Sequence, residues 1–349
     1  MALKPPVEVP QGAIRLNTDS QKLEFYAQGQ WWEMATDTPV LDGGARGFWA
    51  GAGLYNPSGS SWSESNVINM VTIPTAGNAT DFGDLTQSVR EIGGSAASRT
   101  RAIRAGGNIG PAHTDTIDYF TMAQQANAID FGNLTAQFLG FGASVAGSET
   151  RGIFSFSYDN GRNNTDTIEY VTIASTGNAN DFGNITTARH TQQCSSSPTR
   201  TLIWGGMNPS RLKVIDYITT ATTGNASDFG DLVIAQSRAG VTGNSTRGIF
   251  GGGEDPSGTT TRAQSVQYAT LGNSVEFGDV VDKNVEYAGA CSSPIRALWG
   301  GGSGGGGGMT GNNVISYRTI ATNGGGVDFG DLTNRGQSRA AMSNAHGGL

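Results

Sequence analysis

The sequence predicts an all-β protein in which a six-bladed β-propeller follows a small N-terminal β-meander. Three observations predict this fold: the composition, a set of phrases that recurs six times, and the places where the chain enters and leaves the repeat. Glycine supplies 53 of the 349 residues, roughly twice its usual share, and charged residues make up only 15%. Such a composition is typical of short strands joined by tight turns, and the hydrophobic 36% is enough to form a core.

The main evidence is an internal repeat, whose best-kept phrase is Asp-Phe-Gly-Asp-Leu. Its phenylalanines, 47 to 52 residues apart, are Phe82, Phe131, Phe182, Phe229, Phe277 and Phe329. A second phrase, clearest as Thr-Arg-Gly-Ile-Phe-Gly-Gly-Gly, carries Arg46, Arg101, Arg151, Arg200, Arg247 and Arg296. A third, such as Ile-Glu-Tyr-Val-Thr-Ile-Ala, carries Tyr119, Tyr170, Tyr217, Tyr268 and Tyr317, with Met70 at the tyrosine place of the first copy. Repeats of this length are typical of propellers.

Each copy of the repeat predicts four strands. The tyrosine phrase alternates apolar and polar residues and is rich in β-branched side chains, which indicates a strand. The arginine phrase is a short apolar run that ends in glycines, as an inner strand near a crowded axis requires. The Gly-Asn-Ala-Ser-Asp-Phe-Gly segment reads as a turn, and the residues after it lead into a further strand. Four strands per period, without helical periodicity, predict a propeller blade.

The ends of the chain favour a closed ring over an open solenoid. The chain enters the repeat at residues 45–49, in the glycine-ending strand, without the strand that should come before it. It leaves the repeat at residues 337–342, in a segment that resembles the missing strand. We therefore expect the C-terminal strand to complete the first blade of a propeller over residues 42–349. Closure would remove the exposed sheet edges that invite aggregation.

The sequence of residues 1–40 predicts a separate β-module. Three short strands are expected at Ala13–Asn17, Lys22–Ala27 and Gln30–Ala35, joined by turns at residues 17–20 and 28–29. Three strands bury little surface alone, so the module needs a partner: the propeller, a copy of itself or another protein. Trp31 and Trp32 are adjacent and would face opposite ways in a strand. One can pack inward while the other serves attachment, although both could instead cover the propeller.

The repeat resembles the Kelch repeat, with the phenylalanine of the Asp-Phe-Gly turn at the family's tryptophan place. The resemblance covers residues 46–349 and implies a propeller. It depends on a glycine doublet before the tyrosine strand, at Gly106-Gly107, Gly205-Gly206, Gly251-Gly252 and Gly300-Gly301. The first copy loosens the doublet at residues 51–53, and the third replaces it with Phe156-Ser157.

A second resemblance bears on function. The arrays are similar to repeats of tail-fibre-like and other virion proteins of aquatic phages, including cyanophages, and residues 12–36 are similar to modules that begin many phage fibre and structural proteins. This implies a bacteriophage virion structural protein, made in the host cytoplasm. A tail fibre or tail-associated protein is the first expectation. Its N-terminal module would bind other virion proteins, and a homo-trimer is an open alternative for the oligomeric state. The alternatives are a capsid decoration or head-fibre protein, a glycan-cleaving tailspike-type enzyme and a cellular Kelch-type scaffold.

The charge and the hydropathy of the sequence limit the classes of partner that we expect. The net charge is −7 and no run of Lys or Arg occurs, which argues against nucleic acid, because nucleic-acid binding needs a basic face. The first residues lack the apolar core of a secretory signal. No stretch approaches the roughly 18 apolar residues of a membrane span, so no membrane insertion is expected.

No catalytic, cofactor or metal motif stands out, and we expect neither an enzyme nor a cofactor. The three histidines lie in unrelated contexts, which argues against zinc. Cys194 and Cys291 hold matching places in different repeats, too far apart for a disulfide. A carboxylate pair for glycan cleavage can still be assembled by folding, so the enzyme alternative stays open.

The repeated charged residues are expected to be structural. The six acids of the Asp-Phe-Gly turn should cap it by accepting backbone N–H bonds, with calcium binding as the alternative. The six arginines should pair with a repeat acid or a backbone carbonyl, with an anion-binding ring as the alternative. Trp49 and Trp299 match Phe250 and Phe154 of other copies, so they belong to the core.

Recognition is expected from loops between the second and third strands of each copy. They differ most in length and sequence and should emerge on one face, where they could bind a host-surface glycan or protein. Trp62 lies in the irregular insertion of the first copy and is the candidate recognition residue. The expected loops are Asn56–Ser65, Asn108–Thr116, Asp159–Thr165, Glu254–Thr261 and Gly302–Asn312.

Overall fold

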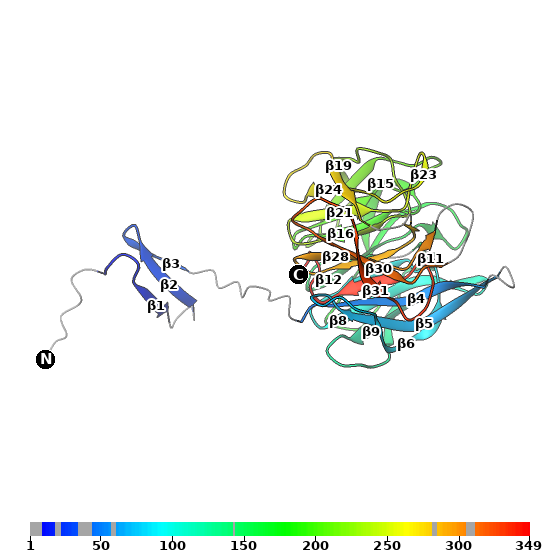
Figure 1. Cartoon of the computed structure of the whole chain (residues 1–349), viewed down its shortest axis with the longest axis horizontal. Helices are drawn as coiled ribbons and strands as arrows, with labels where there is room; N and C mark the ends of the chain where they lie inside the picture. The colour runs from blue at the N-terminus through cyan, green and yellow to red at the C-terminus, as the bar shows by residue number, and fades with distance from the viewer. Residues whose placement is uncertain are drawn as a thin grey trace. The chain divides into compact units, whose positions relative to one another are not determined.

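The computed structural model describes residues 9–17, 22–33, 44–56, 61–141, 144–280, 285–304 and 311–349. Within these ranges all regular structure is β-strand, in several small antiparallel sheets, which confirms the all-β prediction. No helix among the described residues is long and apolar enough to cross a membrane. The chain divides into two compact units, residues 1–43 and 44–349, whose strands are labelled in Figure 1.

The N-terminal unit is a three-stranded meander. Its strands are β1 (Ile14–Asn17), β2 (Lys22–Ala27) and β3 (Gln30–Glu33), paired in that order. Gln28 and Gly29 have φ angles of 53° and 81°, and two left-handed residues are what a tight hairpin turn between twisted strands requires. Residues 18–20 of the first expected turn and 34–35 of the third expected strand lie outside the described residues.

The second unit contains six sheets built from the repeat, which we number 1 to 6. In pairing order, sheet 1 contains β32 (Ala340–Ser343), β4 (Arg46–Asn56), β5 (Ser61–Thr72) and β6 (Thr80–Val89). Sheet 2 contains β7 (Gly94–Ala97), β8 (Arg101–Ile109), β9 (Ala112–Thr121) and β10 (Ile129–Asn133). Sheet 3 contains β12 (Arg151–Ser155), β14 (Thr165–Thr172) and β15 (Asn180–Arg189). Sheet 4 contains β16 (Gln193–Ser196), β17 (Arg200–Trp204), β18 (Val214–Thr219) and β19 (Ser227–Asp231). Sheet 5 contains β20 (Gly240–Gly243), β21 (Arg247–Gly251), β24 (Arg262–Gln267) and β25 (Val275–Asp279). Sheet 6 contains β27 (Gly289–Ser292), β28 (Arg296–Gly300), β30 (Val314–Thr319) and β31 (Val327–Asp331).

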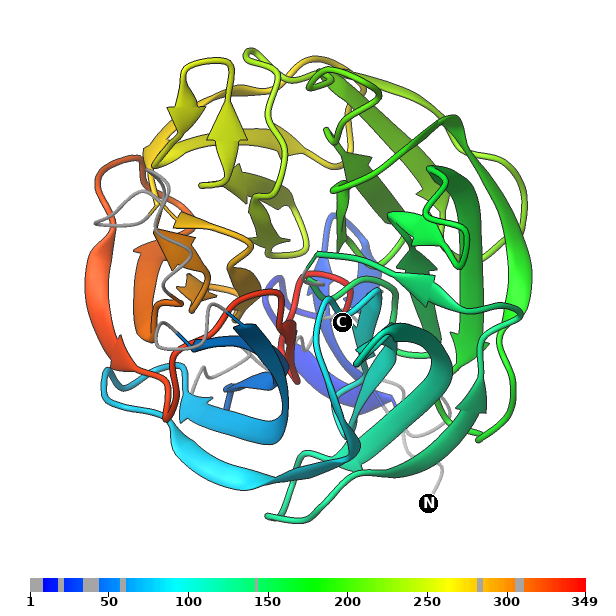
Figure 2. The same ribbon diagram turned by 90° about the vertical axis from the view of Figure 1, so that its right-hand side faces the viewer.

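Three two-stranded sheets add to these. They pair β11 (Phe138–Leu139) with β13 (Tyr158–Asp159), β22 (Glu254–Asp255) with β23 (Gly258–Thr259), and β26 (Val285–Glu286) with β29 (Ser303–Gly304). Figure 2 shows the repeat sheets side by side around a circle, with the C-terminus near its middle.

Sheet 1 is made from both ends of this unit. Strand β32 pairs antiparallel with β4, so that Ala341 lies opposite Trp49 and Met342 opposite Phe48. This is the pairing that the order of the repeat predicts. It leaves β4 with a partner on each side, β32 and β5.

The repeat arginines join each sheet to the next. Arg46 of sheet 1 donates from Nη1 to the main-chain oxygen of Met122 in sheet 2, at 2.7 Å. The same bond recurs in every copy, and Arg296 of sheet 6 donates to Ile73 and Pro74, which follow β5 of sheet 1. The cycle of bonds thus returns to its start, and the prediction that these arginines bind backbone carbonyls is confirmed.

The Asp-Phe-Gly segments, which the sequence predicted as turns, lie in the last strand of each repeat sheet, and they interlock with the next sheet; these strands are β6, β10, β15, β19, β25 and β31. A Cβ atom on Gly330 would lie 2.4 Å from the carbonyl oxygen of Gly77, and the amide of Asp331 donates to Oδ1 of Asn78 at 3.0 Å. This position of β31 therefore requires glycine both for its φ of 147° and for this close approach. The expected capping bond, from the glycine N–H to the aspartate Oδ1, forms at Asp81, Asp181 and Asp328.

Apolar side chains fill the space between neighbouring sheets. Phe48 and Phe82 of sheet 1 meet Phe120 of sheet 2 with ring centroids 5.3 and 5.6 Å apart. Trp49 and Trp299 are buried, and each donates its indole N–H to a glycine carbonyl of the preceding sheet, at 2.9 and 3.1 Å. Their predicted place in the core is confirmed.

The predicted place of Tyr268 is wrong. In sheet 2, Tyr119 lies opposite Ile103, and the matching residue of sheet 5, opposite Ile249, is Ser265. Tyr268 comes three residues later, is buried, and donates its hydroxyl to Ser195 Oγ at 2.8 Å. The fifth copy has the same length as the others between its third strand and the repeat phenylalanine, and its tyrosine occurs three residues later, at the place of Met122 in sheet 2.

Candidate functional site

The expected loop face is built largely from extended hairpins. The pairing of β4 with β5 continues to Asn56 and Ser61, and that of β8 with β9 continues to Ile109 and Ala112, so the described residues of two expected loops are mostly strand; residues 57–60 lie outside the described residues. Glu64 of the first hairpin accepts from Arg90 Nε and from the amide of Gly110 in the second hairpin, both at 3.1 Å. Contacts of this kind place neighbouring hairpins on the same side of the circle of sheets.

Trp62 belongs to β5 and not to a loop, which corrects the prediction. It lies opposite Tyr55, with ring centroids 5.2 Å apart, and its ring covers Gly53. The side chain is half-buried. The irregular sequence around it hid the fact that the two aromatic residues pair across the hairpin. Trp62 therefore presents one edge of its ring at the hairpin and does not stand free.

Five residues near the middle of the circle have left-handed backbone conformations, with φ between 51° and 60°; they are Glu91, Thr191, Arg238, Tyr287 and Ser338. Each lies two or three residues before the first strand of its sheet. Main-chain bonds run from Ser338 to Tyr287 at 3.0 Å and from Tyr287 to Arg238 at 2.8 Å, and others continue the series. We call these residues the central ring. Such conformations are costly for residues other than glycine, and they often mark functional sites.

A charged cluster surrounds Arg238 of the central ring. Its Nη1 atom contacts Glu254 Oε1 at 2.9 Å and Glu286 Oε2 at 3.0 Å, and Arg211 contacts the other oxygen of Glu254 at 2.5 Å. Burial, followed by the charge of Glu254, raises the pKa of Glu286. These side chains keep between 16% and 28% of their surface exposed, so a ligand in solution can reach them.

Aromatic rings adjoin this charged cluster. The Arg238 guanidinium lies 5.1 Å from the ring of Tyr287, which contacts Phe141 at 5.4 Å. Phe141 meets Tyr158, and Tyr158 stacks on His190 at 4.8 Å. Burial, followed by the charge of Arg238, lowers the pKa of His190, so the stacked imidazole is neutral near pH 7. Rings beside paired charges can bind a sugar or a polar peptide.

The carboxylates of Glu254 and Glu286 converge as the enzyme alternative requires. Both contact the same nitrogen of Arg238, so neither carboxylate stands free. Sequence reasoning missed this group, because its members come from four separate segments: Arg211 lies between β17 and β18, Arg238 before β20, Glu254 in β22 and Glu286 in β26. The one sequence signal that could have pointed to this group is that Arg238 and Tyr287 hold the same place in two copies, two residues before the first strands β20 and β27.

The two faces of the N-terminal sheet differ in polarity. Trp31 lies on one face, with its ring 4.1 Å from the Arg15 guanidinium, and Arg15 pairs with Glu24 at 2.7 Å. Hydrogen bonds from Asn17 and then Arg15 lower the pKa of Glu24. Trp32 lies on the other face, opposite Phe25. That face, which we call the apolar face, is 37–63% exposed and consists of Ile14, Leu16, Leu23, Phe25 and Trp32.

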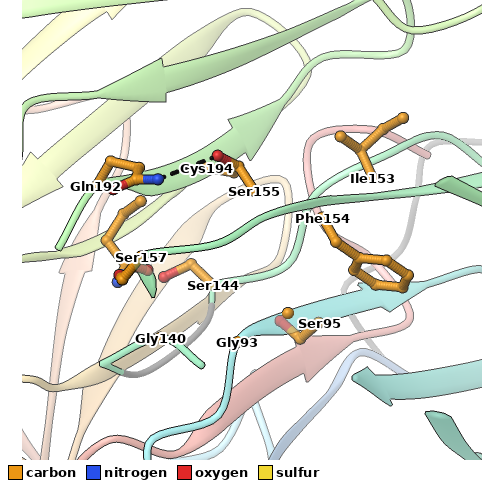
Figure 3. A pocket seen from close by; sticks show the side chains of 12 residues that line it. Gly93, Ser95, Gly140, Ser144, Ile153, Phe154, Ser155, Ser157, Gln192 and Cys194 are labelled. Atoms are coloured by element: carbon orange, nitrogen blue, oxygen red, sulfur yellow. Dashed lines mark hydrogen bonds between the residues drawn. The ribbon is translucent and has the colours of Figure 1, made fainter. Parts of the chain in front are cut away.

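Metal and thiol chemistry find little support in the described part of the chain. No group of three or more His, Cys, Asp or Glu residues there could hold a metal ion. Cys194 and Cys291 are free and buried, and burial raises the pKa of Cys194 to about 12. The small cavity near Cys194 is lined by Ser144, Ser155 and Gln192 (Figure 3). Its volume of about 10 Å³ has room for one water molecule and not for a ligand.

Comparison with models of known protein families and with curated proteins gave no match for this chain.

Proposed function

We propose that this chain is a structural protein of a bacteriophage particle, in which the six repeat sheets are the blades of a closed, Kelch-like propeller. The observation that supports closure best is the cycle of arginine bonds, in which Arg296 of the last sheet returns to Ile73 and Pro74 of the first. The pairing of β32 with β4 supports it independently. The virion assignment rests on the resemblance of residues 12–36 to the modules that begin phage fibre proteins.

The propeller offers its hairpin face to the host surface. The support is the group of Arg211, Arg238, Glu254 and Glu286 beside the half-buried rings of Tyr158 and Tyr287, which matches the hydroxyls and ring faces of a glycan. A rigid frame carrying varied hairpins on one side is a common arrangement for recognition.

The N-terminal module attaches the propeller to other virion proteins. Its apolar face carries five large exposed side chains on a sheet too small to be stable alone, so this face needs a partner surface. Trp32 is the residue of the Trp31–Trp32 pair that can reach such a surface. The same face could join three copies into a trimer.

Locating the chain in the intact particle by cryo-EM tests the assignment. A position on the tail with the hairpin face outward is the expected result. A position on the capsid lattice would replace host binding with capsid decoration, and absence from the particle would overturn the virion assignment.

Binding to host cells tests the hairpin face directly. We expect Tyr158→Ala and Trp62→Ala each to reduce binding of the purified chain several-fold, whereas Ile129→Ser, an exposed outer position, leaves it unchanged. Equal binding by all three variants would exclude this face. Release of oligosaccharides from host polysaccharide that Glu254→Gln and Glu286→Gln abolish would favour the tailspike-type enzyme instead.

A further inference from the structure

Four of the six repeat sheets carry a tyrosine ring at their outer end, packed against the repeat arginine. The ring centroids of Tyr119, Tyr170, Tyr217 and Tyr317 lie 4.5–5.2 Å from the guanidinium carbons of Arg101, Arg151, Arg200 and Arg296. Each ring also meets the phenylalanine of its own Asp-Phe-Gly strand edge-on, at 5.6–6.0 Å. The molecule thus contains four examples of the same aromatic place.

In sheet 5 this place is empty, because Ser265 stands where the other sheets have tyrosine. A cavity of about 180 Å³ opens there, lined by Arg247, Ser265, Gln267, Leu271 and Val275 among others. Ser265 and Val275 are opposite each other, as Tyr119 and Ile129 are in sheet 2, so the cavity lies where the tyrosine ring would be. We call it the sheet-5 pocket.

The lining of the sheet-5 pocket suits an aromatic ring. Arg247 is held by a bond from Nη1 to the carbonyl oxygen of Ile320, at 2.9 Å, as its counterparts are in the other sheets. Leu271 and Val275 are 57% and 62% exposed at the rim. A fixed guanidinium beside apolar walls favours a ring through cation–π attraction and burial.

We propose that the sheet-5 pocket binds a tyrosine side chain presented by a partner protein. The volume favours a single side chain, because pockets for drug-sized ligands occupy roughly 300–1,000 Å³ and a cavity of about 150 Å³ holds one benzene. Tyrosine is a frequent anchor residue in protein interfaces. The exposed apolar rim gives the neighbouring partner residues a surface to cover. This inference does not rest on the proposed virion function.

The test is a titration of the full chain with N-acetyl-tyrosinamide, followed by NMR. Binding with a dissociation constant on the order of 1 mM is expected for so small a probe. N-acetyl-leucinamide should bind at least tenfold more weakly. Ser265→Tyr should abolish binding by filling the pocket, whereas Ser227→Tyr, at the exposed start of the fourth strand in sheet 4, should leave it intact.

Three results would overturn the proposal. They are equal affinity for the leucine probe, unchanged binding of the tyrosine probe to the Ser265→Tyr chain, and no binding of N-acetyl-tyrosinamide at a concentration tenfold above the expected dissociation constant. Binding of p-cresol without binding of N-acetyl-tyrosinamide would also overturn it, because the pocket would then admit a free phenol but not a side chain.

Discussion

At the scale of single residues, glycine in the Asp-Phe-Gly strand is required for two separate reasons, its backbone conformation and a close contact with the next sheet. Gly330 combines a φ of 147° with an approach to Gly77 that leaves no room for a methyl group. Gly77 has a similar φ of 156°, but nothing lies within 4 Å of the place where its Cβ would be. The two positions therefore separate backbone strain from steric contact.

We expect Gly330→Ala to lower the free energy of unfolding by about 3 kcal/mol or more, because strain and the clash with a fixed carbonyl add together. Gly77→Ala should cost only about 1–2 kcal/mol from strain. Urea unfolding of both variants measures the difference. Equal costs would mean that the contact between sheets 6 and 1 is looser than described.

Ser265→Tyr should also stabilise the free chain. The new ring would gain a cation–π contact with Arg247 and cover apolar surface, which together are worth about 1 kcal/mol. Ser227→Tyr, at an exposed position, should change stability little. Thermal unfolding of the two variants beside the parent chain checks this, and a destabilised Ser265→Tyr chain would show that the pocket does not fit a ring.

At the scale of elements, the short strand β32 is important for the stability of sheet 1. Without it, β4 would lose one of its two partners and expose an edge of ladder groups. We expect deletion of residues 340–349 to lower the midpoint of urea unfolding markedly and to cause aggregation, visible by light scattering. Deletion of residues 1–43 is the matched control and should leave the midpoint unchanged, since these residues form a separate unit.

The faces of β3 make a similar contrast. Trp32→Ser should weaken attachment to the virion partner while the module stays folded, because this ring is on the apolar face. Trp31→Ser should instead loosen the module, because Trp31 packs on Arg15 and on Tyr26, whose ring lies 5.3 Å away. Co-sedimentation with particles and circular dichroism separate the two effects. Loss of attachment in the Trp31 variant alone would reverse the assignment.

At the scale of the whole molecule, the last residues fill the middle of the circle of sheets. His346 is buried, donates from Nε2 to the carbonyl of Ala97 in sheet 2, and accepts at Nδ1 from the amide of Gly348. Gly347 lies against carbonyls of Asn244 and Ser196, which belong to sheets 5 and 4. The tail therefore contacts several sheets at once, and both imidazole nitrogens are engaged in the neutral form.

Burial lowers the pKa of His346 to about 4 from its ordinary 6.5. The unfolded chain therefore binds more protons between these values, and stability falls as the pH drops from 6.5 towards 4. The loss over the whole window is about 3 kcal/mol, and His346→Gln should remove most of this slope. Urea unfolding at pH 7 and pH 4.5 tests it, and an equal slope in both chains would assign the acid sensitivity elsewhere.

Features that repeat could be predicted from the sequence, and features that occur once could not. The first three strands of a copy, the role of Arg46 and its equivalents, and the pairing of the C-terminal strand all follow from comparing copies, whereas the Asp-Phe-Gly strand was predicted as a turn. Tyr268 misled because a similar phrase occurs three residues later in the fifth copy, while the strand itself keeps the spacing of the other copies. The charged group around Arg238 depends on residues from distant segments, and only the folded sheets bring them together.

The position of β4 has a mechanical meaning. Tension applied to the chain through residue 44 would enter at the start of this strand, which lies between β32 and β5. Pulling it out requires two hydrogen-bond ladders to be sheared at once, and one of them is made by the other end of the same polypeptide. A force transmitted from the N-terminal side would therefore be resisted by the hydrogen bonds between β4 and the C-terminal strand β32.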